Sequence, residues 1–144
     1  WDILITIACA FAISKAMVNS GVADAVARFI IGMSHHYGPH VLLAAVFIIT
    51  NLFTELITNN AAAALAFPLA LSISSQMGVS PMPFFVVICM AASASFSTPI
   101  GYQTNLIVQG IGNYKFTDFV RIGLPLNIIT FLISIFLIPL IWPF

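Results

Sequence analysis

Apolar segments follow one another along almost the whole of this 144-residue chain and leave room for few charges. Hydrophobic residues make up 61% of the sequence and charged residues only 6%, whereas an ordinary soluble domain carries about 25% charged residues. Four basic and four acidic side chains cannot cover the surface of a soluble protein of this length. Their balance also excludes a nucleic-acid-binding protein, which needs a basic surface. The composition therefore predicts an all-α membrane protein, since helices satisfy their own backbone polar groups in lipid.

Three segments predict helices that span the membrane or lie on it. Residues 1–19 are just long enough to cross the hydrocarbon layer at about 1.5 Å per residue. Residues 22–34 place Asp24 and Arg28 one helical turn apart, with apolar residues on the opposite face, so we expect an amphipathic helix at the interface. Residues 121–144 are apolar almost throughout and predict a full span.

Two further segments are interrupted by polar residues. In residues 41–76, the apolar runs Val41–Leu52 and Ala61–Ile73 have 12 and 13 residues, too few for a crossing of about 20 residues. We therefore expect a re-entrant hairpin that enters and leaves on the same side of the membrane. In residues 82–112, the polar, proline-containing stretch Ser97–Asn105 predicts a broken helix.

The two interruptions, at Thr58–Asn60 and Ser97–Asn105, predict a binding site. Irregular backbone at membrane depth survives only inside protein or beside a water-filled cavity, because each unpaired group costs several kcal/mol in lipid. Each break supplies helix-end carbonyls, which suit Na⁺, and helix-start amides, which suit an anion. Side-chain amides and hydroxyls add donors and acceptors within short reach, namely those of Asn59, Asn60, Thr104 and Asn105. The alternative is that these residues only hydrogen-bond helices together, but two clusters that both adjoin a break favour a site.

Glu55 is the only acidic residue close to either break. A carboxylate is costly in the bilayer, so Glu55 either contributes to coupling with an ion or proton or pairs with a donor in a part of the protein outside this sequence. The histidines His35, His36 and His40 lack a fourth ligand with metal-site spacing, and we expect a hydrated loop there. No cofactor and no metal other than Na⁺ is predicted.

The residues around the two breaks resemble a known family. The segment Thr54–Ala61, which reads TELITNNA, resembles the Ser-Asn-Thr hairpin motif of the divalent anion/sodium symporters, which carry dicarboxylates, citrate or sulfate. Ser97–Asn105 is similar to the unwound Thr-Pro segment of the same family. The order and spacing of both motifs agree, and the resemblance covers the whole chain. It implies the second of two inverted repeats, with the N-terminal half of the transporter outside this sequence.

The resemblance implies a multi-span transporter half with a re-entrant hairpin and an unwound helix. Its function would be sodium-coupled symport of a divalent anion across the cell membrane by an elevator mechanism, in a homodimer. The residues expected to bind the anion are Thr58, Asn59, Asn60, Thr104 and Asn105. Those expected to bind sodium are Thr54, Ile57, Asn59, Ser97 and Thr98.

Several alternatives stay open from the sequence. The hairpin motif reads Thr-Asn-Asn rather than Ser-Asn-Thr, which leaves sulfate and a dicarboxylate equally credible. A proton-coupled or uncoupled carrier of another oxyanion, such as arsenite, would share the architecture. A structural membrane subunit would not need two helix breaks. The sequence has no His-Glu-x-x-His, no Gly-x-Ser-x-Gly and no paired intramembrane Asp, and we predict no enzyme activity.

Overall fold

The computed structural model describes residues 1–33 and 38–144, and in these ranges the chain forms helices and no strand. The elements are α1 (Asp2–Asn19), α2 (Val22–Met33), α3 (Gly38–Leu56), α4 (Asn59–Met77), α5 (Met82–Ser93), α6 (Gln103–Gly112) and α7 (Phe116–Ile141). The prediction of an all-α fold is therefore confirmed. His35 and His36 lie outside the described residues. His40 lies in the first turn of α3 rather than in the expected loop.

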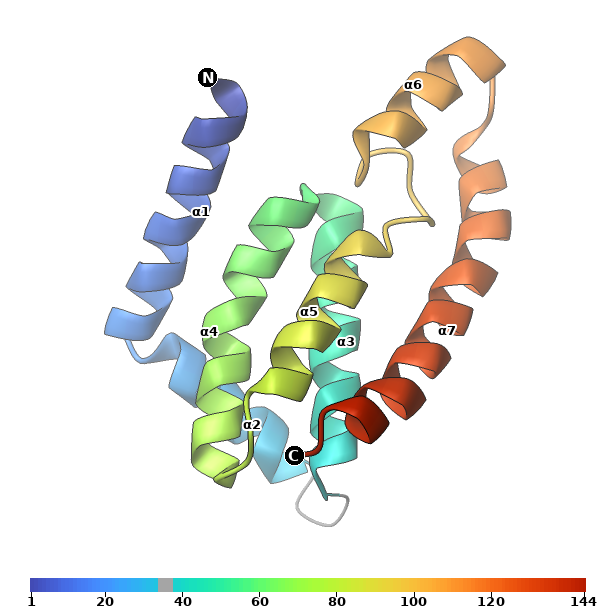
Figure 1. Ribbon diagram of the computed structural model, residues 1–144. Coiled ribbons are helices and arrows are strands. Elements are labelled where there is room, and N and C mark those ends of the chain that lie inside the picture. The colour runs from blue at the N-terminus through green and yellow to red at the C-terminus, as the bar shows by residue number, and fades with distance from the viewer. Residues whose placement is uncertain (34–37) are drawn as a thin grey trace.

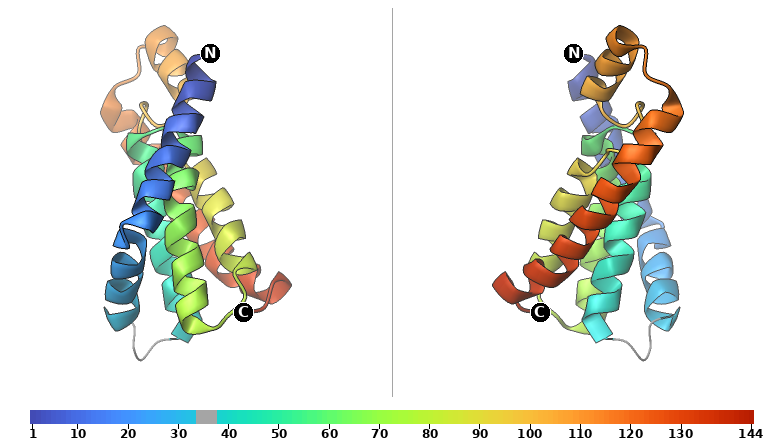
Figure 2. Two further views of the ribbon diagram at one scale, coloured as in Figure 1. Left: turned by 90° about the vertical axis from the view of Figure 1, so that its left-hand side faces the viewer. Right: turned by 90° about the vertical axis from the view of Figure 1, so that its right-hand side faces the viewer.

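Helices α3, α4 and α5 form the centre of the molecule, as Figure 1 shows. Helix α1 packs against α4 on one side, and α7 packs against α3 and α5 on the other. Helices α1 and α2 meet at an angle of 70°, and the bend is made by Gly21, whose φ is +73°. The views in Figure 2 show α2 continuing from the lower end of α1, beside the part of the hairpin that is farthest from its tip. The hydroxyl of Ser72 on α4 donates a hydrogen bond to Asp24, which fastens α2 to the hairpin.

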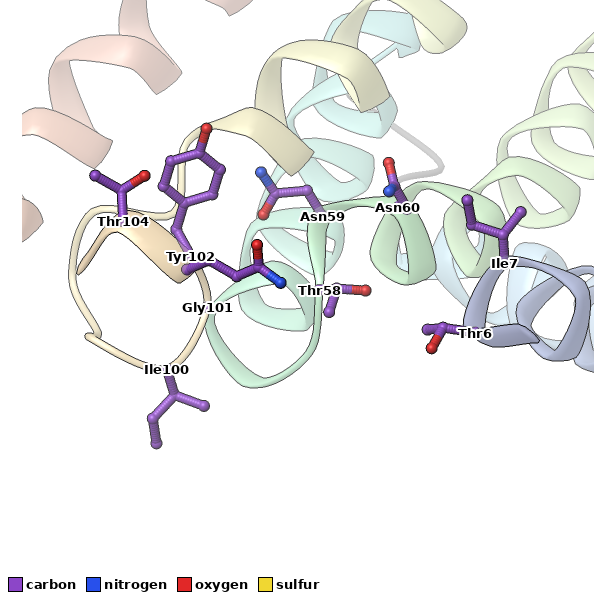
Figure 3. A pocket seen from close by; sticks show the side chains of 10 residues that line it. Thr6, Ile7, Thr58, Asn59, Asn60, Ile100, Gly101, Tyr102 and Thr104 are labelled. Carbon is purple, nitrogen blue, oxygen red and sulfur yellow. The ribbon is translucent and has the colours of Figure 1, made fainter. Parts of the chain in front are cut away.

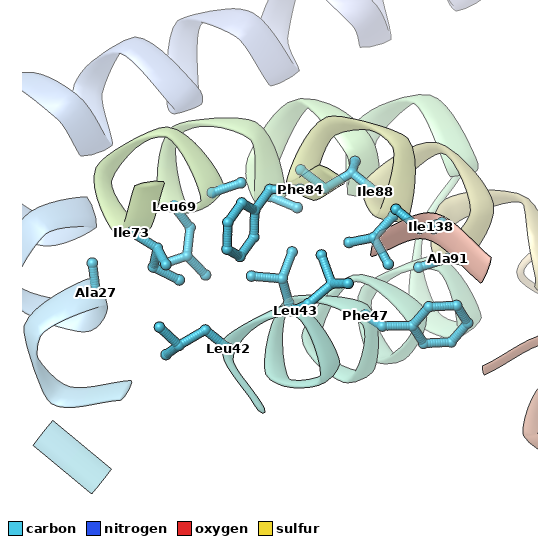
Figure 4. Packing of buried hydrophobic residues seen from close by; sticks show 14 of the residues in the cluster. Ala27, Leu42, Leu43, Phe47, Leu69, Ile73, Phe84, Ile88, Ala91 and Ile138 are labelled. Carbon is cyan, nitrogen blue, oxygen red and sulfur yellow. The ribbon is translucent and has the colours of Figure 1, made fainter. Parts of the chain in front are cut away.

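The core lies between the three central helices (Figure 4). Leu43 and Phe47 of α3 meet Phe84 of α5 there, and all three are buried. Alanines at several core positions of α4 and α5 let the helices approach closely, which is how helices associate in lipid. Large apolar side chains cover the outside of α1 and α7, including Phe136 at 70% exposure, which suits a surface that faces lipid.

Two described helices, α3 and α7, are long and apolar enough to cross a membrane, and the bent pair of α1 and α2 passes the same test as one unit. The expectation of half-length hairpin helices is wrong, because α3 and α4 have 19 residues each. Helix α3 begins before Val41 and continues through Asn51 and Thr54, whose side chains bond to carbonyls at the end of α5. The hairpin itself turns at residues 57–58. Its same-side arrangement in the membrane stays a prediction, although α6 and α7 extend past its tip in Figure 1.

The second interruption begins earlier than expected. Helix α5 ends at Ser93, and α6 begins at Gln103, so the connection comprises residues 94–102 rather than the expected Ser97–Asn105. Pro99 within it disfavours a helical residue before it. Helix α7 starts at Phe116, ahead of the expected span at residue 121, because the backbone N–H of Lys115 donates to Asp118 Oδ2 at 2.8 Å and stabilises the helix start.

The backbone of α7 lies directly against this connection at Gly123. A Cβ atom at Gly123 would overlap the carbonyl group of Phe96. We expect Gly123→Ala to destabilise the purified protein by about 1–3 kcal/mol through overpacking, measured as a lower melting temperature in detergent. Gly110→Ala on α6 is the control, because its Cβ meets nothing within 4 Å. Equal melting temperatures for Gly123→Ala and the wild type would contradict the close approach of α7.

Candidate functional site

The hairpin turn brings the end of one helix next to the start of another. Helix α3 ends at Leu56, and Thr58 has an extended conformation with φ −66° and ψ 149°. Its hydroxyl accepts a hydrogen bond from the backbone N–H of Ala61 at 3.4 Å, so that Thr58 caps the N-terminus of α4. The partial negative charge of the α3 carbonyls and the partial positive charge of the α4 amides therefore lie side by side.

Four polar groups, from α3, α4, α5 and the connection between α5 and α6, converge inside the hairpin tip. We call them the oxygen cluster: the side chains of Thr54 and Asn59 and the carbonyls of Ala92 and Gly101. Thr54 Oγ1 donates to the Ala92 carbonyl at 2.7 Å. One end of the Asn59 amide lies 2.7 Å from Thr54 Oγ1, 3.2 Å from the Ala92 oxygen and 3.3 Å from the Gly101 oxygen. We assign the amide nitrogen to this end, because an amide oxygen would be repelled by the two carbonyl oxygens unless a cation lay between them.

The connection between α5 and α6 is bonded to the last turn of α3. Ser95 Oγ donates to the Thr54 carbonyl at 3.1 Å, and Thr98 Oγ1 donates to the Glu55 carbonyl at 2.7 Å. Gly101 packs so closely that a Cβ atom there would overlap Ser95 Oγ and the Thr54 carbonyl. The carbonyls that end α3 and the irregular backbone of the connection thus satisfy each other, as burial in a membrane protein requires.

Glu55 is 8% exposed and takes part in the same assembly. Its Oε1 atom accepts from the backbone N–H of Ser97 at 2.9 Å and from Asn127 Nδ2 at 2.8 Å. Its Oε2 atom is buried and has no hydrogen-bond partner. In the part of the chain that the structure describes, no basic side chain pairs with Glu55. The carboxylate therefore draws its stabilisation from two donors on other segments.

A pocket of about 400 Å³ adjoins the oxygen cluster (Figure 3). It lies between the hairpin tip, the start of α6 and the N-terminal part of α1. Helices α4 and α6 both begin at this pocket, with Thr58 and Tyr102 as their N-cap residues. All of its lining residues are uncharged, and most carry a hydroxyl or an amide: Thr6, Thr58, Asn59, Asn60, Tyr102, Gln103 and Thr104. Such a pocket presents hydrogen-bond donors and two helix N-termini without a formal charge.

The structure brings some of the predicted site residues together and separates others. Four of the five residues predicted to bind the anion line the pocket: Thr58, Asn59, Asn60 and Thr104. Asn105 faces the connection instead and donates to the carbonyls of Ser95 at 3.0 Å and Thr98 at 3.1 Å. The sequence-based binding roles themselves stay predictions.

Among the residues predicted to bind sodium, Thr54 and Asn59 meet in the oxygen cluster. Ile57 lies in the two-residue hairpin turn. The described hydrogen bonds of Ser97 and Thr98 are to Glu55 and to groups of the connection, α6 and α7, not to Asn59. The carbonyls of Ala92 and Gly101 lie beside Asn59 in their place.

Sequence reasoning missed Asn127, which bridges α7 and the connection. Its amide nitrogen donates to Glu55 Oε1 and to Ser97 Oγ, both at 2.8 Å. Asn127 is the only side-chain amide in residues 122–144. A lone amide in an apolar span is costly unless it has a partner, and this signal could have identified it.

Thr54 and Thr50 allow a matched test of the oxygen cluster, because both are fully buried on α3. We expect Thr54→Val to lower the free energy of unfolding by about 1–3 kcal/mol, since it leaves the Asn59 amide without its nearest partner. Thr50 Oγ1 donates only to the Val46 carbonyl of its own helix, at 2.7 Å. Thr50→Val should therefore lower the free energy of unfolding by less than Thr54→Val does. Thermal unfolding in detergent measures both, and equal losses would argue against the cluster.

Comparisons with known proteins identify relatives of this chain that are named as transporters. A family model described as citrate transporter (CitMHS) matches residues 1–143. The chain is 40% identical over 142 residues to an uncharacterised transporter of Synechocystis, covering 99% of this chain and 23% of the relative. It is 37% identical over 139 residues to sodium/sulfate cotransporter 1 of Chlamydomonas reinhardtii, covering 96% of this chain and 16% of the relative.

A more distant relative is the sodium-dependent dicarboxylate transporter SdcS of Staphylococcus saprophyticus, 25% identical over 146 residues, which covers 99% of this chain and 27% of the relative. The chain thus spans about a quarter or less of the length of the relatives it matches. The family match extends over both helix breaks and the spans around them, and it confirms the resemblance seen in the sequence. The chain therefore belongs to the citrate transporter family of multi-pass membrane proteins.

Proposed function

We propose that the protein containing this chain carries a divalent anion, sulfate or a dicarboxylate, across the cell membrane together with Na⁺. The observation that carries the proposal is the oxygen cluster around Asn59 beside an uncharged pocket at which two helices begin. Two relatives, which are named as a sodium/sulfate cotransporter and a sodium-dependent dicarboxylate transporter, support it. The substrate is moved and not changed chemically.

The cation part of the proposal rests on the chemistry of the oxygen cluster. Backbone carbonyls at unwound helix ends and neutral side-chain oxygens are the ligands that transporters use for Na⁺. In the cluster, the Thr54 hydroxyl and the carbonyls of Ala92 and Gly101 face one end of the Asn59 amide. A rotation of that amide by 180° would turn its oxygen toward these groups and complete a set of four oxygens, which only a cation would stabilise.

The anion part rests on the pocket. A dianion in a site without basic side chains needs N–H and O–H donors, and the start of α4 and of α6 together with Thr58 and Asn60 offers them. Because the helix ends supply only partial charges, a bound cation nearby would strengthen anion binding considerably. This dependence of the anion on the cation is the physical basis for coupled transport.

We further propose that the hairpin, the connection and α7 move together against a scaffold, in the manner of an elevator. The hydrogen bonds among Thr54, Glu55, Ser95, Thr98 and Asn127 support movement as one unit. The scaffold would come from other segments, including an N-terminal half, and a homodimer is expected from the family resemblance.

Uptake by the full-length protein in liposomes tests the proposal. Labelled sulfate or succinate should accumulate only when an inward Na⁺ gradient is imposed. Accumulation driven by a proton gradient, or transport without any gradient dependence, would favour the alternative carriers of other oxyanions. Absence of transport for both anions and for arsenite would favour a structural subunit.

Asn59 is the residue on which the sodium assignment depends most. We expect Asn59→Ala to reduce Na⁺-dependent uptake to background while expression is retained, because the cluster then lacks the only side chain that faces all of its other members. The control is Asn19→Ala. Asn19 is an exposed residue at the C-terminal end of α1, whereas the pocket adjoins the N-terminal part of α1, so this substitution should leave uptake unchanged. Normal uptake by Asn59→Ala would remove the sodium assignment.

Thr58 and Asn60 line the pocket without belonging to the oxygen cluster. If they contact the anion, Thr58→Val and Asn60→Ala should change the ratio in which unlabelled succinate and sulfate inhibit uptake of labelled sulfate. The Na⁺ concentration for half-maximal uptake should change much less. Inhibition profiles identical to those of the wild type would contradict a role of these side chains in selectivity.

A further inference from the structure

A buried polar contact joins three separate elements next to the oxygen cluster. Glu55 lies in the last turn of α3, Ser97 in the connection between α5 and α6, and Asn127 on α7. Glu55 Oε1 receives hydrogen bonds from the Ser97 backbone at 2.9 Å and from Asn127 Nδ2 at 2.8 Å. Asn127 Nδ2 also donates to Ser97 Oγ at 2.8 Å. Each of the three residues therefore contacts the other two.

Asn127 takes part in this contact as a hydrogen-bond donor. Both of its amide hydrogens are used, one on Glu55 and one on Ser97. Its Oδ1 atom is buried without a partner, and the residue as a whole is only 7% exposed. Glu55 likewise keeps a buried, unpartnered Oε2 atom. Unpaired buried acceptors are unfavourable, so the arrangement is not explained by helix packing alone.

We propose that Glu55 and Asn127 are positioning residues, which set the place of the connection and thereby the cation affinity of the oxygen cluster. The inference rests on the proposed function, because it concerns the same sodium site. Neither side chain belongs to the cluster. They act on it through the connection, which leaves α5 just after Ala92 and returns to the cluster at Gly101.

The route from Glu55 to the cluster is short and made of described contacts. The Glu55 carbonyl accepts from Thr98 Oγ1 at 2.7 Å, and the same oxygen of Thr98 accepts from the Gly101 N–H at 3.3 Å. Glu55 thus holds Ser97 with its side chain and Thr98 with its backbone. A shift of the connection away from α3 would carry the Gly101 carbonyl away from Asn59. Residues that orient ligands in this way commonly change metal affinity when they are replaced.

The test compares Glu55→Gln, Glu55→Ala and Asn127→Leu in the full-length protein in liposomes. Two quantities are measured: the Na⁺ concentration for half-maximal sulfate or succinate uptake, and the maximal rate at saturating Na⁺. We expect Glu55→Ala and Asn127→Leu to raise the Na⁺ concentration by about 10- to 100-fold, with much of the maximal rate recovered at high Na⁺. Glu55→Gln should lie between wild type and Glu55→Ala, because glutamine keeps an acceptor but loses the charge.

Thr130→Val on α7 is the matched control, since Thr130 Oγ1 donates only to the Leu126 carbonyl of its own helix at 2.9 Å. It should leave both quantities unchanged. Half-maximal Na⁺ concentrations equal to that of the wild type in Glu55→Ala and Asn127→Leu would overturn the inference. So would a loss of maximal rate that high Na⁺ does not recover, with folding verified by melting temperature. If the wild type itself transports without Na⁺, the proposed function fails first, and the two failures are distinguishable.

Discussion

Backbone polar groups that leave a helix inside a membrane protein must find partners within the protein, and this requirement shapes the centre of the molecule. Two helix interruptions meet here, and each supplies what the other lacks. The last carbonyls of α3 accept from Ser95 and Thr98 of the connection, while the Thr54 hydroxyl donates back to the end of α5. Neither irregular segment would be stable alone in an apolar environment. The site is therefore a property of the pair of breaks rather than of either motif.

The absence of charge around the pocket follows from the same requirement. A basic side chain at this depth would bind an anion strongly, but it would also need a counter-ion whenever the pocket was empty. Hydroxyls, amides and helix N-termini provide partial charges that cost much less to bury. Glu55 is the exception, and it is buried among donors from two other segments rather than facing the pocket.

The existence of both breaks could be predicted from the sequence, because amide-rich and proline-containing stretches rarely lie inside apolar runs unless the helix is interrupted there. The residues at which each break begins and ends could not be predicted. Asn51, Thr54 and Glu55 look like the start of an interruption, yet they stay helical because their side chains find partners on α5 and on the connection. Those partners are 38 or more residues away in the chain, and no local pattern indicates them.

The orientation of individual side chains could not be predicted from the sequence either. Thr104 and Asn105 are neighbours in the first turn of α6, and one lines the pocket while the other bonds to the connection. Which of them faces the pocket depends on where α6 begins, and it begins directly after the proline-containing connection, whose path is set by contacts with α3 and α7. Asn127 can be singled out in the sequence as a lone amide in an apolar span, but its partner Glu55 is 72 residues away and no local pattern indicates it.

The close approach of Gly123 to the Phe96 carbonyl has a consequence for how the connection could move. At this point the backbone of α7 touches the backbone of the connection, with no side chain between them. A displacement of the connection toward α7 at Phe96 would therefore have to carry α7 with it.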